Sequence, residues 1–270
     1  MINISNLHKK FNPGSVNEVY ALKGIDLHIK EGEFITVIGT NGSGKSTLLN
    51  AISGTFFPDS GTIAVNGIDM SSKAEHTRAG YISRVFQDPF KGTAPEMTVA
   101  ENIQIAILRG KRHLMKVGLN SKQIQNFISE LQKMEMNLDT RLESIIGTLS
   151  GGQRQAISLL MAVIQKPKVL LLDEHTAALD PKSAAQVIKL TKKFIEKDNL
   201  TTLMITHSMQ QALSLGNRLI MMHHGKIIDD INSEEKSRLT ENDLLNKFEQ
   251  IKKKEKLSTS LINEFRDEYA

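Results

Sequence analysis

Residues 39–46, GTNGSGKS, match the pattern G-x-x-x-x-G-K-[ST] at every fixed position. Glycines let a backbone curl until successive N–H groups point inward at phosphate oxygens, and the start of a helix behind them adds positive charge. Lys45 would place its ammonium on the β and γ phosphates, and the Ser46 hydroxyl suits Mg²⁺, a hard cation that prefers oxygen. The segment therefore predicts a nucleoside triphosphate site, and a glycine-rich turn without a ligand is the less favoured alternative. The residues expected to contact the nucleotide there are Gly39, Asn41, Gly42, Ser43, Gly44, Lys45, Ser46 and Thr47.

Two acids, Asp173 and Glu174, directly follow the continuous apolar run Val169–Leu172. Such a run is typical of a strand buried on both faces, and open α/β sheets bind ligands at the carboxyl ends of their strands. We expect Asp173 to hold Mg²⁺, directly or through water. Glu174, on the other face of the strand, would polarise a water for attack on the γ phosphate. The pair by itself could equally cap the next helix, but the phosphate loop upstream favours hydrolysis.

The elements that must position these residues alternate between strands and helices. Apolar runs of strand length are separated by longer helical patterns, which predicts an α/β fold with a parallel sheet. A strand over Phe34–Ile38 leads into the phosphate loop, and a helix should run from Lys45 to Gly54. The other strands expected for this sheet are Tyr81–Phe86, Val169–Leu172, Leu203–Thr206 and Leu219–Met222.

Turn and capping signals define the remaining elements. Asn66-Gly67 predicts a β-hairpin, and Thr98 with Glu101 has the spacing of a capping box that opens a helix. Asp180-Pro181 should start another helix. Residues from about 92 to 163 are expected to be mostly helical, including a helix whose apolar face carries Ile124, Phe127, Ile128, Leu131 and Met134. His223 and His224 match no motif, and we expect both on the surface of a hairpin that turns at His224-Gly225.

Composition narrows the class of protein. The chain has 270 residues, of which 40% are hydrophobic and 24% charged, and its net charge is +4. The absence of cysteine excludes disulfides, thiolate metal sites and cysteine nucleophiles. The longest apolar stretch, Ala156–Ile164, is about half the length of a membrane span, and the start MINISNLHKKF lacks the apolar segment of a secretory signal. These features predict a soluble globular protein.

Two basic segments have simple interpretations. The charged, helix-prone residues 248–270, with the run Lys252–Lys256, are expected to form a solvated surface helix or a frayed tail. The cluster Arg109, Lys111, Arg112 and Lys116 could face anionic lipid headgroups, but a solvated loop is the favoured interpretation.

Residues 149–155, LSGGQRQ, distinguish among the classes of protein that carry a phosphate loop. The segment resembles the LSGGQ signature of ATP-binding-cassette (ABC) ATPases. Ser150 and the amides of Gly151 and Gly152 would form a second anion site at the start of a helix. In that family, this site closes over ATP held by the opposite subunit. The resemblance therefore implies that Ser150, Gly151, Gly152 and Gln153 contact ATP in a head-to-tail dimer, with two nucleotides between two copies of the chain.

Other motifs of the ABC family are also present, in the same order along the chain as in that family. Gln87, after the expected strand Tyr81–Phe86, is similar to the Q-loop glutamine, which implies that it senses Mg²⁺ and the attacking water. Ala178-Leu179-Asp180 resembles the D-loop, which implies that Asp180 lies by the nucleotide and communicates across the dimer. His207 matches the switch histidine, implied to contact the γ phosphate and to orient Glu174. His175 stands where many relatives have proline, a departure that should leave the phosphate chemistry intact.

Phe11 occupies the place of the aromatic residue that stacks on adenine in this family, although the nearby Tyr20 could compete for that role. Stacking uses the face of the ring and tolerates different bases. The resemblance covers residues from about 1 to 247. It implies a P-loop NTPase (RecA-like) α/β core, an N-terminal antiparallel β subdomain and an inserted α-helical subdomain over about 92–163.

The partners also follow from the resemblance. Transport would require a separate transmembrane permease, whose docking helix should lie in a groove lined by Asp88–Pro95, with Phe90 either an anchor for that helix or buried inside the subdomain. An extracytoplasmic solute-binding protein would act indirectly, and the chain would be cytoplasmic, peripheral on the inner face of the cell membrane. The strings FNPGSVNEVYAL, GTNGSGKSTLLN, FQDPFKGTAPEMT and DEHTAALDPK are similar to ATPase subunits of bacterial tryptophan/tyrosine uptake systems.

The alternative is a soluble ABC ATPase that works in assembly or maintenance, such as cluster assembly, without a permease. A nucleic-acid partner is not expected, because the sequence has no interleaved aromatic and basic platform.

Overall fold

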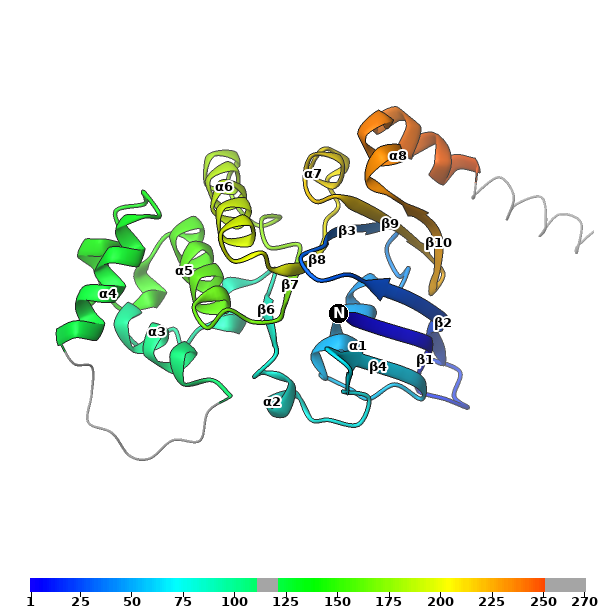
Figure 1. The fold of residues 1–270 in the computed structure, drawn as a ribbon, viewed down its shortest axis with the longest axis horizontal. Coiled ribbons are helices and arrows are strands. Elements are labelled where there is room, and N and C mark those ends of the chain that lie inside the picture. Colours follow the sequence, from blue (N-terminus) through cyan, green and yellow to red (C-terminus); the bar gives the residue numbers. More distant parts are fainter. Residues whose placement is uncertain (111–120, 251–270) are drawn as a thin grey trace, which may run out of the picture.

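A mixed sheet of six strands forms the centre of the computed structural model, which describes residues 1–110 and 121–250 (Figure 1). The strand order is β10-β9-β3-β8-β7-β6. Strands β9, β3, β8, β7 and β6 are parallel, and β10 pairs antiparallel with β9. The bounds are β3 (Phe34–Gly39), β6 (Ile82–Val85), β7 (Val169–Asp173), β8 (Thr201–Ile205), β9 (Arg218–His223) and β10 (Lys226–Ile231). This arrangement confirms the predicted α/β class.

A second sheet is antiparallel throughout, with the order β2-β1-β4-β5. Its strands are β1 (Ile2–Phe11), β2 (Val19–Ile29), β4 (Ser60–Val65) and β5 (Ile68–Asp69). The β4–β5 hairpin turns at Asn66 and Gly67, whose φ angles of 52° and 75° are those of a tight two-residue turn. The predicted N-terminal antiparallel sheet is therefore present.

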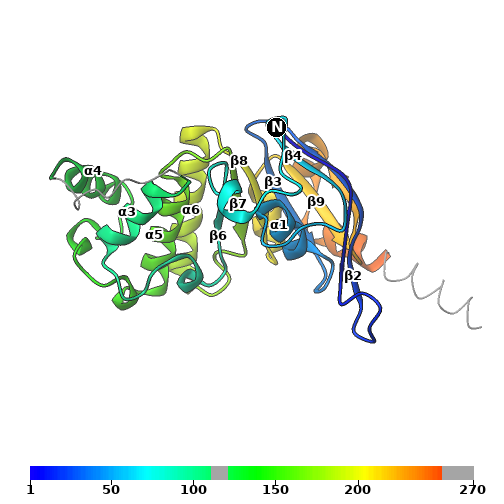
Figure 2. The same ribbon diagram turned by 90° about the horizontal axis from the view of Figure 1, so that it is seen from below.

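Helix α1 (Lys45–Ser53) fills the space between the two sheets (Figures 1 and 2). Its buried side chains Leu48, Leu49 and Ile52 share one apolar cluster with residues of β1, β2 and β4 on one side and β3, β7 and β8 on the other. The end of α1 is closed by Arg78, from α2 (Glu75–Arg78), which is fully buried and donates to the carbonyls of Ala51 and Ile52. The helix behind the phosphate loop is thus held along its length and at its end.

Four helices gather on the other side of the parallel sheet: α3 (Val99–Leu108), α4 (Ser121–Gln132), α5 (Gly151–Val163) and α6 (Pro181–Asp198). They share one apolar cluster with side chains of β6 and β7. The capping box of α3 is formed as predicted, with Thr98 and Glu101 bonded reciprocally. Helix α4 ends before Met134, so this residue does not continue its apolar face as predicted, although Met134 is buried in the same cluster. A short 3-10 turn at Pro89–Gly92 lies between β6 and α3, and two more, at Asp139–Arg141 and Ile146–Thr148, lie between α4 and α5.

The C-terminal part of the described chain covers β9. Helices α7 (Met209–Ser214) and α8 (Ser233–Arg238) pack there, and Phe248 joins the same apolar cluster. Lys236 of α8 is buried, and its ammonium donates to Thr36 of β3 at 3.2 Å, while burial lowers its pKa to about 8. Lys111, Arg112 and Lys116 of the predicted basic cluster, and the run Lys252–Lys256, lie outside the described residues.

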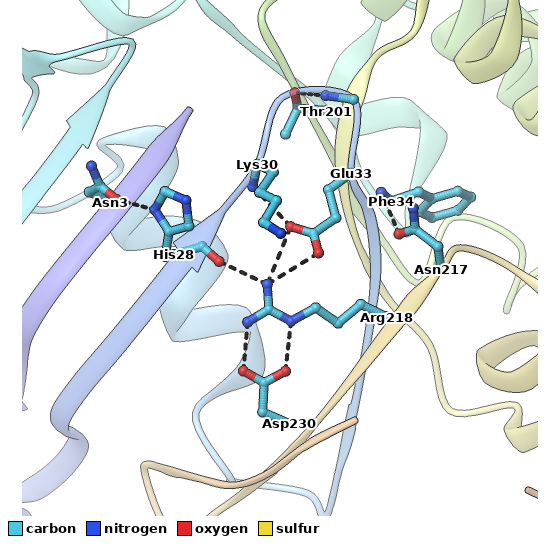
Figure 3. A network of polar contacts seen from close by, with 10 residues as sticks. Asn3, His28, Lys30, Glu33, Phe34, Thr201, Asn217, Arg218 and Asp230 are labelled. Carbon is cyan, nitrogen blue, oxygen red and sulfur yellow. Dashed lines mark hydrogen bonds and ion pairs between the residues drawn. The ribbon is translucent and has the colours of Figure 1, made fainter. Parts of the chain in front are cut away.

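Arg218, at the start of β9, ties three segments together (Figure 3). Its guanidinium donates to both oxygens of Asp230 in β10 at 2.6 Å and to the carbonyl of His28 in β2 at 2.8 Å. It also contacts Glu33, in the loop before β3, at 3.2 Å. The hydrogen bonds to Asp230 raise the pKa of Arg218. The network joins the two sheets at the end of β3 opposite the phosphate loop.

Replacing Arg218 by alanine should lower the free energy of unfolding by about 2 kcal/mol, because charge-assisted hydrogen bonds in a partly buried setting are each worth roughly 1.5–3 kcal/mol. Arg238→Ala is the matched control, since its pair with Glu234 is highly exposed and such pairs contribute about 0–1 kcal/mol. Urea unfolding followed by circular dichroism measures both variants. Equal losses for the two would contradict a structural role for the Arg218 network.

Candidate active site

The predicted motif residues meet at one edge of the parallel sheet. Gly39 ends β3 and residues 40–46 follow it, Gln87 follows β6, Asp173 ends β7 and His207 follows β8. Because these four strands are parallel, their carboxyl ends lie at the same edge, which is where ligands bind in open α/β sheets. Chain segments far apart in sequence are thereby brought to one place.

The phosphate loop packs closely between the backbones of β9 and β2. A Cβ atom at Gly39 would lie 2.3 Å from the carbonyl oxygen of Met222, and one at Gly44, where φ is 98°, would lie 2.6 Å from that of Ala21. Only glycine fits such approaches. The ammonium of Lys45 donates to the carbonyls of Gly39 at 2.9 Å and Thr40 at 3.1 Å, so the loop curls around it.

Lys45 is almost completely buried. Burial lowers its pKa, and the carboxylates of Glu174 and Asp173 act in the opposite direction. The ammonium of the phosphate loop and the two carboxylates after β7 are therefore close enough to interact electrostatically within one site. The hydroxyl of Ser43 is buried with no partner in the described part of the chain, so a polar atom of the loop is left for a ligand.

His223 is a functional neighbour that the sequence prediction placed wrongly. It is buried, and its Nδ1 lies 3.1 Å from the hydroxyl of Thr40 in the phosphate loop. The reason is strand order: β9 lies beside β3, so its last residue reaches the same edge as the loop. The next residues support the loop too, because the N–H of Gly225 donates to the carbonyl of Ser43 at 3.0 Å. His224, with φ of 46°, is exposed at the turn as predicted.

Glu174 and His207 form a pair, with Oε1 and Nε2 2.6 Å apart. The Glu174 side chain is 13% exposed and that of His207 49%, so a substrate can reach them from the histidine side. Glu174 has a φ of 47°, a left-handed conformation that costs energy for a residue with a side chain and is common at functional sites. Its N–H donates to the carbonyl of Ile205 at the end of β8, which holds this conformation. The arrangement can activate a water molecule.

His175, next to Glu174, is buried. Its Nε2 lies 3.0 Å from the hydroxyl of Thr191, which itself donates to the carbonyl of Val187 at 2.8 Å. The hydroxyl has one proton to give, so Nε2–H of His175 must be the donor. Burial lowers the pKa of His175 to about 4, and the ring is neutral. It links the end of β7 to α6 and adds no charge to the site.

Oxygen donors for a hard metal ion are present. Asp173 and Gln87 line a common cavity of about 370 Å³, and Ser46 is exposed at the start of α1. Within residues 1–110 and 121–250, no group of three or more acidic or histidine side chains could hold a metal by itself. This donor set fits Mg²⁺, which usually takes one or two protein oxygens together with substrate phosphates and water.

The signature segment begins α5 and carries its own cap. The Ser150 hydroxyl accepts from the N–H of Gln153, and the Gln153 side chain accepts from the N–H of Ser150, both at 3.3 Å. Ser150 and Gly151 are exposed. Gly152 packs closely against Ser183 of α6, because a Cβ atom on residue 152 would lie only 2.5 Å from the Cβ of Ser183. Asp180 caps α6, accepting from the N–H of Ser183 at 3.0 Å. Helix α5 lies across β6 and β7 from α1 (Figures 1 and 2).

Phe11 and Tyr20 point to opposite faces of the β1–β2 ribbon. The register pairs Lys10 with Tyr20 and Phe11 with Val19, and neighbouring residues of a strand alternate between faces. The Tyr20 hydroxyl contacts His8, and its ring has the Lys10 ammonium 4.9 Å from its centroid. Phe11 is half-buried, its ring edge-to-face with that of Phe56 at 5.3 Å. One base cannot contact both rings from the same side.

A phosphate loop after β3, two acids after β7 and a histidine after β8 define an ATPase of the P-loop class. Comparison with protein families makes the assignment specific: the profile described as "ABC transporter" matches residues 22–177. The chain belongs to the ABC transporter family.

Known relatives agree with this assignment. The chain is 47% identical to the tyrosine transport ATP-binding protein of Clostridioides difficile, covering 92% of this chain and 99% of that protein. It is 35% identical to the methionine import ATP-binding protein MetN of Vibrio vulnificus, over 85% of this chain and 64% of that protein. A dimeric structure of the ATP-binding cassette MJ0796 in a post-hydrolysis state, bound to ADP and Pi, superposes with a TM-score of 0.74 at 29% identity, covering 86% of this chain and 99% of that one.

The chain is therefore the ATPase subunit of an ABC transporter, of the importer kind that these relatives represent, and it couples ATP hydrolysis to transport. In the described ranges, no helix has both the length and the apolar character needed to cross a bilayer.

Glu174→Gln should retain ATP binding and lose hydrolysis by at least about 100-fold, because an amide cannot accept the proton of the attacking water. Calorimetry measures ATP affinity, and phosphate release measures turnover. Glu143→Gln, which changes an exposed acid outside the site, is the control. Turnover of Glu174→Gln within about tenfold of the natural chain would mean that another group accepts the proton.

Proposed function

We propose that the chain hydrolyses ATP as a head-to-tail pair of copies. Each nucleotide would lie between residues 39–46 of one copy and Ser150, Gly151, Gly152 and Gln153 of the other, with Asp180 beside the junction. The separation of α5 from α1 supports this, since the two helices belong to different apolar clusters on opposite sides of the parallel sheet (Figures 1 and 2). The dimeric structure of MJ0796 is a precedent from a protein of similar fold.

The observation that carries the proposed chemistry is the contact of Glu174 with His207 beside the phosphate loop. The amides of residues 39–46 and Lys45 would hold the phosphates, while Thr47 continues this contact at the start of α1. Glu174 would take a proton from a water whose oxygen attacks the γ phosphorus, as the bond to the bridging oxygen breaks. His207 would keep the carboxylate aimed and contact the γ phosphate. Magnesium, bound through Ser46, Asp173 and Gln87, would supply neutralising charge on the phosphates.

For the base, we propose Phe11 as the stacking residue. The Phe11 ring lies on one face of the β1–β2 ribbon, where it contacts the ring of Phe56, a residue that follows α1. The Tyr20 ring lies on the other face, where His8 and Lys10 contact it. Stacking on a ring face predicts weak discrimination between adenine and guanine.

Phe11→Ala should weaken ATP binding by roughly 5- to 150-fold, which corresponds to the 1–3 kcal/mol typical of base stacking on an aromatic ring. Tyr20→Ala, which removes an aromatic ring from the other face of the same ribbon, should leave the affinity unchanged. Fluorescent-nucleotide titration measures both variants. The assignment would be reversed if Tyr20→Ala had the larger effect.

The permease would dock in an apolar groove between the parallel sheet and the helical layer. The groove is a cavity of about 490 Å³ lined by residues of β6, the 3-10 turn Pro89–Gly92, α3 and α5. Ile105 of α3 lines it and is 49% exposed. Phe90, in the same 3-10 turn, is not among the residues that line the groove, but it is equally exposed, so it is not a buried core residue. The Arg154 guanidinium lies 3.8 Å from the centroid of its ring, which leaves Phe90 available as an anchor at the edge of the groove. This contact would keep the chain at the inner face of the cell membrane.

We propose an aromatic amino acid, tyrosine first, as the transported solute. The support is the 47% identity to a tyrosine transport ATP-binding protein over nearly the full length of both chains. An extracytoplasmic binding protein would deliver the solute to the permease. The names of these relatives, tyrosine transport for one and methionine import for the other, favour this function over a soluble assembly factor. The direct test is ATP-dependent uptake of labelled tyrosine by vesicles that contain the co-purified permease, and uptake of a different solute alone would contradict the proposed substrate.

Ile105→Glu should abolish co-purification with the permease while ATP affinity stays unchanged, because it places a charge in the apolar groove and not in the nucleotide site. Ile228→Glu is the control, since Ile228 is a partly exposed isoleucine of β10 outside the groove. Affinity capture of the tagged ATPase from detergent-solubilised membranes measures both variants. Full capture of the permease by Ile105→Glu would contradict docking at this groove.

A further inference from the structure

Arg84 of β6 is paired with the carboxylate that the proposed mechanism gives to magnesium. One terminal nitrogen lies 2.5 Å from Oδ2 of Asp173, and the two side chains are only 13% and 14% exposed. A guanidinium stays charged at all working pH values. In the chain without nucleotide, the negative charge of Asp173 is therefore already balanced by a protein cation.

The Arg84 side chain is fixed by two further contacts. Its other terminal nitrogen donates to Oδ1 of Asn50 in α1, the helix that starts with the phosphate loop. Its guanidinium also lies over the ring of Phe86, 4.7 Å from the centroid. Arg84 thereby ties the end of β7 to α1 and sets the direction of the Asp173 carboxylate. The planar fork of arginine makes two such contacts at once, which lysine does not.

Arg84 also lies in the wall between two cavities. It lines the cavity of about 370 Å³ that holds Asp173 and Gln87, and it lines the groove of about 490 Å³ in which docking is proposed. Because Arg84 lines the same cavity as Asp173 and Gln87, removing its charge would change the electrostatic potential at the proposed metal site.

We propose that Arg84 is a positioning residue that holds Asp173 and competes with the metal for it, so that a divalent cation is admitted only together with nucleotide phosphates. This rests on the proposed role of Asp173 as a metal ligand. The guanidinium and the metal are both cations, and each needs the same carboxylate at close range, where like charges repel strongly. The negative phosphates supply the charge that offsets this repulsion.

The test measures Mn²⁺ binding to the full chain without nucleotide, by the electron paramagnetic resonance signal of free Mn²⁺. Arg84→Gln should bind Mn²⁺ at least about tenfold more tightly than the natural chain, because a nearby positive charge is removed. Arg84→Lys keeps the charge and should stay close to the natural chain. Arg109→Gln is the matched control: Arg109 lines the same groove but donates to Ser83 and the carbonyl of Ala162, not to Asp173.

Adding Asp173→Asn to Arg84→Gln should remove the gain in Mn²⁺ affinity. Thermal unfolding of each variant verifies that it is folded. The inference is overturned if Arg84→Gln binds Mn²⁺ no more tightly than the natural chain, or if Arg109→Gln gains as much. A separate titration of Mn²⁺ with ATP present tests the underlying function: if Asp173→Asn binds the metal as well as the natural chain there, Asp173 is not the metal ligand and the proposed function itself fails at this point.

Discussion

The phosphate loop packs closely against the backbone of neighbouring strands, and this packing fixes the geometry of the whole site. Gly39 and Gly44 have no room for a side chain, because carbonyl oxygens of Met222 and Ala21 occupy that space. The loop is therefore fixed from both sides before any ligand binds, and its amides need not be ordered at a cost in entropy. The helix behind it is fixed as well, since Arg78 closes its end.

The chemically active groups of the site are each held by a local partner. Lys45 donates to carbonyls of its own loop, Asp173 is paired with Arg84, and Glu174 is paired with His207. A buried charge without a partner would be costly, so these contacts allow the site to persist without nucleotide. In the proposed mechanism, the phosphates of ATP would replace the carbonyls of Gly39 and Thr40 as partners of Lys45.

Much of this architecture could be predicted from local sequence. The capping box at Thr98, the Asn66-Gly67 hairpin and the start of α6 at Asp180 depend on residues within a few positions of one another, and all three are confirmed. The contacts that were missed depend on strand order. His223 touches Thr40 because β9 lies beside β3, and Arg84 touches Asp173 because β6 lies beside β7. No periodicity within one segment reports which strands are neighbours, so these partners could only be found in the folded chain.

Complementation between two inactive variants tests whether each hydrolytic site is completed by a second copy. One variant, Lys45→Ala, would have a defective phosphate loop, and the other, Ser150→Arg, a defective signature segment. The measurement is ATP hydrolysis by each variant alone and by an equal mixture. We expect each variant to be inactive alone and the mixture to recover part of the activity, because mixed pairs contain one intact site. A mixture no more active than its parts, or a fully active Ser150→Arg, would contradict this expectation.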